Sequence, residues 1–88
     1  MTLRYVVLHH TGYDEDHFDV MVERERGGVL RTWRSATWPI SGTVTPIHDH
    51  RRKYLDYEGP ISGGRGEVRR VAAGTCESPI DLGIHEDA

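Results

Sequence analysis

Three residues in the first quarter of the chain could bind a divalent metal ion. His17 and Asp19 are two residues apart in a run of alternating apolar and polar residues, so a strand there would point both side chains to one face. His10 ends the preceding apolar run, across a short loop. Two imidazoles and a carboxylate with open coordination positions suit Mn²⁺, Fe²⁺ or Zn²⁺, whereas Ca²⁺ favours more oxygen ligands. In an arbitrary sequence, however, a His-x-Asp pair is more often a hydrogen-bonded surface pair, so the spacing alone does not establish a metal site.

The elements that must position these residues are predicted to be strands. The apolar run Tyr5–Leu8 predicts a buried strand, and the segment 12–16 predicts the loop after it. The strand from His17 should place Phe18, Val20 and Val22 on one face, with His17, Asp19, Met21 and Glu23 on the other. Gly27-Gly28 between this strand and Val29–Trp33 predicts a tight hairpin, because both glycines tolerate positive φ.

The rest of the chain also predicts short strands with little helix. Strands are expected at Thr43–Thr45, with Pro46 at an edge or strand end, and at Tyr57–Ile61, Glu67–Val71, Thr75–Glu77 and Ile80–Leu82. Ala72–Gly74 is expected to break the strand before it, and Arg51–Asp56 to form one helical turn or a loop. The fold class is therefore mainly β: a small antiparallel β-barrel or rolled sheet. Residues 1–88 should form a single domain with a polar tail from about 83 to 88.

The composition limits the classes of function. The chain has 88 residues, of which 28% are charged, but its net charge of −3 is too small for the disordered class. Cys76 is the single cysteine, which rules out an intrachain disulfide and a zinc site built from cysteines. No apolar run approaches the ~20 residues that cross a bilayer, so we expect a cytoplasmic protein with no membrane partner. Ten of the eleven basic residues are arginine, a good phosphate ligand, although surface arginines are common whatever the ligand.

A series of motifs along the chain resembles the 3'-phosphoesterase module of bacterial DNA ligase D. The motifs are His10, then His17-Phe18-Asp19, then Gly28-Val29-Leu30-Arg31-Thr32-Trp33, and finally Asp49-His50, Tyr54 and Tyr57-Glu58-Gly59-Pro60-Ile61. Their order and approximate spacing agree with that family from about Arg4 to Glu77. Several ordered motifs are more specific than a single His-x-Asp pair, so the resemblance favours the metal site.

The resemblance implies a set of roles. It assigns His10, His17 and Asp19 to a divalent metal, most often Mn²⁺ in the family, with Zn²⁺ as the alternative. The loop between the histidines is one residue longer than in the family, so His9 stays open as the ligand in place of His10. His50 and Tyr54 match the family's pair that holds or protonates the substrate phosphate. The implied reaction removes a 3' phosphate or a terminal ribonucleotide from DNA or DNA-RNA ends, with a DNA repair ligase or polymerase as the expected partner.

The chain departs from the family pattern in its arginines. Met21 stands where the family has an arginine two residues after the metal-binding aspartate, and a second family arginine is absent near residues 41–43. Candidates to replace these phosphate ligands are Arg31, Arg52 and Arg65, with Arg51 as a further option. The departures favour an alternative, a binding module for nucleic-acid ends that has weakened catalysis. A hydrolase for an unrelated phosphoester is a third hypothesis.

The other histidines and the tryptophans receive structural interpretations. His48 is expected on the strand face opposite His50, and His85 to be incidental in the polar tail. Of Trp33 and Trp38, one is expected in the core and the other half-buried rather than stacked on a nucleobase. The sequence does not predict an oligomeric state.

Overall fold

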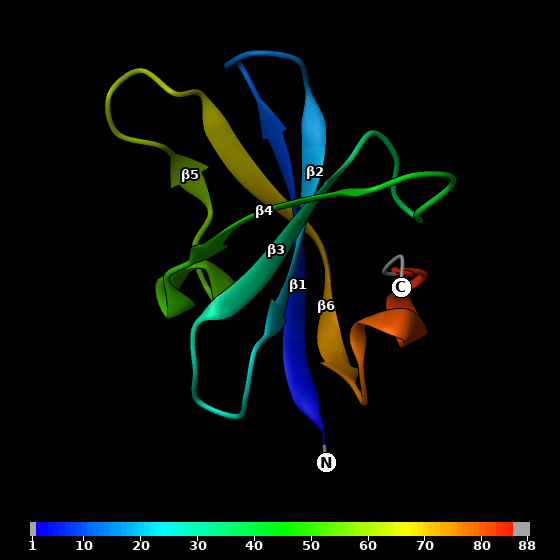
Figure 1. The fold of residues 1–88 in the computed structure, drawn as a ribbon. Coiled ribbons are helices and arrows are strands. Elements are labelled where there is room, and N and C mark those ends of the chain that lie inside the picture. The colour runs from blue at the N-terminus through cyan, green and yellow to red at the C-terminus, as the bar shows by residue number, and fades with distance from the viewer. Residues whose placement is uncertain (1, 86–88) are drawn as a thin grey trace.

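One antiparallel sheet makes up most of the molecule. The computed structural model describes residues 2–85. Its strands are β1 (Leu3–Thr11), β2 (His17–Glu23), β3 (Leu30–Ser35), β4 (Thr45–His50), β5 (Gly59–Pro60) and β6 (Glu67–Cys76), with 3-10 helices η1 (Arg52–Leu55) and η2 (Pro79–Leu82). The strand order is β4-β3-β2-β1-β6-β5, and β3 and β4 cross the view diagonally in front of β1 (Figure 1). The sheet is strongly rolled but does not close, so the rolled-sheet prediction is confirmed and the closed barrel is wrong.

The central strand β1 is buried on both faces of the sheet. Val6 and Leu8 join one apolar cluster, and Val7 joins the other. We call the first the site face; its buried members are Val6, Leu8, Met21, Leu30, Leu55 and Val68. The opposite face contains Val7, Val20, Val22, Trp33, Cys76 and Ile84. The sheet thus has a thin apolar core on each face. A strand that is buried on both faces needs apolar residues at successive positions, which explains the uninterrupted apolar run in β1.

The predicted β2–β3 hairpin forms, but its loop spans residues 25–28 instead of the two glycines alone. Glu23 pairs with Leu30, and the backbone N–H of Arg24 donates to the carbonyl of Val29 over 2.9 Å. Gly27 has φ of 81°, the left-handed conformation that a glycine adopts at low cost. The predicted alternation also holds, because Met21 packs in the site face while Val20 and Val22 pack in the opposite face. Trp33 is buried and Trp38 is half-buried, as expected.

The C-terminal part differs from the sequence prediction in two respects. β6 runs without a break through Ala72–Gly74, because β1 pairs with it along its whole length. The pairing shifts so that Val7 faces Ala72 while Leu8 faces Arg70, and Val71 is left over as an exposed bulge residue. The stretch 80–82 is part of η2 instead of a strand, since Ser78 and Asp81 form a capping box at its start.

The predicted polar tail is also partly wrong. Ile84 is 1% exposed and packs in the opposite face, so residue 84 belongs to the core. His85 is exposed, and residues 86–88 lie outside the described part of the chain. Neither 3-10 helix within residues 2–85 is long and apolar enough to cross a membrane.

The edge strand β4 and the helix after it cover the site face. Pro46 lies in β4, where the missing N–H costs little because β4 is the last strand on its side of the sheet. η1 follows directly, within the segment predicted to be a helical turn or a loop, and its Leu55 is 3% exposed in the site-face core. The predicted strand at Tyr57–Ile61 is reduced to the two residues of β5.

Candidate metal centre

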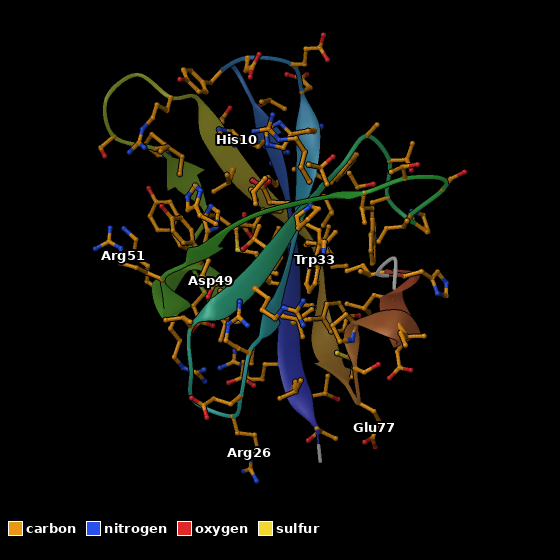
Figure 2. The ribbon with its side chains drawn as sticks, in the orientation of Figure 1. His10, Arg26, Trp33, Asp49, Arg51 and Glu77 are labelled. Atoms are coloured by element: carbon orange, nitrogen blue, oxygen red, sulfur yellow. The ribbon has the colours of Figure 1, made fainter. Side chains whose placement is uncertain are left out.

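The residues predicted to bind metal meet at one end of the β1–β2 pair. His10 and His17 are direct cross-strand partners, and Asp19 follows two residues later on the same face. One nitrogen or oxygen ligand atom from each of the three residues lies within 4.8 Å of the others. His17 and Asp19 are 5% and 4% exposed, so these groups are almost fully removed from water. Figure 2 shows His10 at this end of the sheet.

Hydrogen bonds to backbone carbonyls fix which nitrogen of each histidine faces Asp19. His17 Nδ1 lies 2.8 Å from the carbonyl oxygen of Glu15, and His10 Nε2 lies 2.7 Å from that of Arg65. A carbonyl can only accept, so these nitrogens carry the proton and donate. In a neutral ring the other nitrogen then carries a lone pair, and backbone partners of this kind are typical of metal-binding histidines.

These lone pairs point at the Asp19 carboxylate, one oxygen of which lacks a hydrogen-bond donor. His17 Nε2 lies 3.2 Å from Asp19 Oδ1, and His10 Nδ1 lies 3.6 Å from Asp19 Oδ2. Asp19 Oδ1 is buried and accepts no hydrogen bond from any residue within 2–85. A buried oxygen without a partner is costly, and it is more so when it faces a second lone pair. A cation between these atoms would remove both penalties, so the residues present fit a divalent metal ion.

His9 does not belong to this cluster. Its neighbours in β1 alternate between faces, and His9 stacks on Phe18 with ring centroids 4.5 Å apart. Phe18 packs against the opposite face. The alternative that the sequence left open therefore resolves in favour of His10, which shares a face with Leu8 and Met21.

A loop from β5 to β6 supports His10 from the side. Ile61 N–H donates to the carbonyl of Gly66 over 2.8 Å, which closes the loop that carries Arg65. Gly66 has φ of 77°, and a Cβ there would lie 2.1 Å from the carbonyl oxygen of Thr11. Glycine thus lets the loop approach the end of β1, where the Arg65 carbonyl accepts from His10.

The candidate metal centre opens into a cavity of about 380 Å³. Its lining includes the predicted catalytic residues His50 and Tyr54, and the predicted substrate-binding residue Arg65. His50 and Tyr54 contact edge to face with centroids 5.7 Å apart. Asp49 and Arg51 also line it, and Figure 2 shows Arg51 projecting outward from the β4 side. The structure therefore brings the three candidate metal ligands and the predicted catalytic pair into one cavity.

His50 is held in a defined state. Its Nδ1 lies 3.0 Å from the carbonyl oxygen of His48 and donates to it, which leaves Nε2 as the lone-pair nitrogen. Burial lowers the pKa of His50 below its usual 6.5, an effect that the charge of Asp19 and the His48 carbonyl oppose in part. The neutral ring is therefore the dominant form at pH 7.

The position of His48 differs from the sequence prediction. His48 was expected on the face opposite His50, yet the two rings stack with centroids 4.6 Å apart, and both line the cavity. Residues two apart on a strand share a face, so the spacing itself carried this information.

Two of the three predicted substrate-binding arginines lie elsewhere. Arg31 lies over the ring of Trp33, 4.8 Å from its centroid, and Trp33 belongs to the opposite face. Arg52 donates to buried Glu23 and to the carbonyl of Gly28, at the far end of β2. Neither residue is among those that line the cavity, so the structure does not bring them together with the candidate metal ligands. Arg65 does line it, with its guanidinium bonded to Ser62 in its own loop.

Arg34 is a cavity residue that the motifs in the sequence did not indicate. It is the direct cross-strand partner of Asp19 on β3, and it lines the cavity. Counting outward from a two-residue Gly27-Gly28 turn would pair Asp19 with residue 36, so the turn signal alone does not find Arg34. The observed loop has four residues, 25–28, between Arg24 and Val29, and this register places residue 34 opposite residue 19.

Comparison of the chain with protein-family models and with curated proteins found no match.

Proposed function

We propose that the protein is a metal-dependent phosphoesterase that hydrolyses 3'-phosphate or 3'-ribonucleotide ends of nucleic acid. The observation that carries the proposal is that Asp19 Oδ1 is buried without a hydrogen-bond donor and that its carboxylate faces two imidazoles in a cavity that also includes His50 and Tyr54. The motif series that resembles the ligase D phosphoesterase supplies the substrate class. The same resemblance favours Mn²⁺ as the metal, with Zn²⁺ as the alternative.

The side chains have distinct roles in this proposal. His10, His17 and Asp19 hold the ion, which when bound supplies a Lewis acid for a phosphoryl oxygen. His50 Nε2 accepts a proton from the attacking water as the new phosphorus–oxygen bond forms. The bond from phosphorus to the leaving oxygen breaks on the opposite side of phosphorus, that oxygen takes a proton from solvent water, and His50 releases its proton to solvent. Tyr54 O–H donates to a phosphoryl oxygen and stabilises the charge that develops there.

The setting of the activity follows from the substrate. A nucleic-acid 3' end with a phosphate or a ribonucleotide must be cleaned before it can be extended or sealed. We therefore propose a role in DNA repair, with a repair ligase or polymerase as the candidate partner.

A binding module with weakened catalysis is the second candidate, and one observation favours it. Met21 is 1% exposed and lines the cavity where the resembling family has an arginine. An apolar thioether cannot stabilise a phosphate charge, and loss of one such contact costs roughly 10²- to 10³-fold in rate. Metal-dependent binding of a 3' end without turnover would identify this case.

The experiment is a hydrolysis assay on a primer-template with a 3' phosphate, using purified protein and Mn²⁺. We expect phosphate release that His17→Ala abolishes and that the matched control His9→Ala retains, because His9 lies on the opposite face. No release by folded, metal-loaded protein would refute the phosphoesterase. Faster release from a small phosphate ester than from the primer would refute the nucleic-acid substrate instead.

A further inference from the structure

We infer that Arg34 binds the phosphate group that reacts at the metal centre, an inference that rests on the proposed function. Arg34 faces Asp19 across the β2–β3 pair, and both line the same cavity. Directly opposed residues in an antiparallel pair have Cβ atoms about 5 Å apart, and an arginine side chain extends further than that. Its guanidinium can therefore reach an anion bound beside Asp19.

The Arg34 guanidinium is weakly held in the folded protein. Its ion pair with Asp14 has an N–O distance of 3.8 Å, and the two side chains are 45% and 62% exposed. Exposed pairs of this kind contribute little to stability, so a phosphate can displace Asp14 at small cost. Asp14 lies in the loop between His10 and His17, so this ion pair keeps the guanidinium on the side of the sheet where the two histidines lie.

The other arginines near the site are committed elsewhere. Arg65 donates to both the carbonyl and the hydroxyl of Ser62, and Arg52 pairs with buried Glu23. Arg31 lies on the opposite face against Trp33. Arg51 also lines the cavity, but it projects outward from the β4 side (Figure 2). Arg34 is therefore the arginine best placed to give two parallel hydrogen bonds to a phosphate.

This position also accounts for Met21. Met21 pairs with Thr32 on β3. This pair is the next one on the same face of the sheet after the Asp19–Arg34 pair. Met21 packs into the site-face core. The cationic group that β2 lacks at buried residue 21 is thus supplied by the neighbouring strand at the more exposed residue 34.

The test measures binding of inorganic phosphate by isothermal titration calorimetry to Mn²⁺-loaded protein. Arg34→Ala should weaken phosphate binding by about 10-fold or more, the usual loss for a hydrogen bond to a charged group. Arg34→Lys should recover part of the affinity, since it restores the charge without the two-pronged geometry. Arg31→Ala is the matched control on the same strand and the opposite face, and it should bind phosphate like the wild type. Mn²⁺ affinity should be equal in all four proteins.

The outcomes separate this inference from the proposed function. Equal phosphate affinity in the wild type and Arg34→Ala would overturn it, as would undetectable phosphate binding by the wild type. Arg34-dependent phosphate binding without hydrolysis of the primer would support the inference and refute the phosphoesterase. If hydrolysis occurs, Arg34→Ala should raise KM or lower kcat by a similar factor, whereas unchanged kinetics would also overturn the role of Arg34.

Discussion

Glu23 is a buried carboxylate whose charge should stabilise the fold in a pH-dependent way. It is 3% exposed and accepts hydrogen bonds from the backbone N–H of Arg4 over 2.6 Å and of Gly27 over 2.9 Å. Arg52 adds a charge-assisted hydrogen bond. Burial alone would raise the pKa of Glu23, but these partners outweigh it and lower the pKa from 4.5 to about 2.

The magnitude of the effect follows from this fall in pKa. At about 1.4 kcal/mol for each factor of ten, the difference corresponds to at most about 3 kcal/mol of unfolding free energy. Arg52 is 38% exposed, so water screens part of its contribution. We therefore expect Glu23→Gln to lose about 2 kcal/mol at pH 7, where the wild-type carboxylate is charged in both the folded and unfolded states.

The sign of the pH dependence distinguishes this account from a simple packing effect. A lowered pKa means that the stabilisation is present above pH 4.5 and is lost as the pH falls towards 2. Urea unfolding should give a higher unfolding free energy for the wild type than for Glu23→Gln at pH 7, and this gap should shrink between pH 4.5 and 2. The exposed neighbour Glu25→Gln is the matched control and should follow the wild type. A gap that is absent at pH 7, or that does not shrink in acid, would refute the reasoning.

Two further substitutions test the packing that surrounds the site. Ile84→Ala should lower the unfolding free energy by about 2 to 4 kcal/mol in urea titration, because the side chain is 1% exposed, whereas the 62% exposed Ile80→Ala should have little effect. Equal losses would show that residue 84 is not part of the core. Gly66→Ala should destabilise the protein and weaken Mn²⁺ binding together, since its Cβ would lie 2.1 Å from the Thr11 carbonyl in the loop that supports His10. Calorimetry would measure both effects, and wild-type Mn²⁺ affinity in this variant would contradict the supporting role of the loop.

The first half of the fold was predictable because its signals are local. The alternation from His17 assigned the two faces of β2, and the glycine pair placed the turn before β3. Both depend on residues close in sequence, where strand periodicity and turn chemistry act directly. Strand periodicity is also sufficient to place His48 beside His50, whereas the pairing of Arg34 with Asp19 depends on the four-residue loop that the structure shows.

The second half depends on contacts between distant residues. Ala72–Gly74 resembles a break, but pairing with β1 holds it in β6 and a bulge at Val71 absorbs the misfit. Ile84 looks like part of a tail until the opposite face of the sheet is seen to need cover. Arg52 could be read as a phosphate ligand because nothing in the sequence shows that Glu23, 29 residues earlier, already binds it. Tertiary partners of this kind leave no local pattern.

The most direct test of the metal centre is the stoichiometry of Mn²⁺ binding measured by electron paramagnetic resonance. The wild type and His9→Ala should each bind one ion. His10→Ala, His17→Ala and Asp19→Asn should each lose that binding, while their circular dichroism spectra show that the fold is retained. Wild-type binding by Asp19→Asn, or loss of binding in His9→Ala alone, would contradict the claim that these three side chains enclose a metal ion.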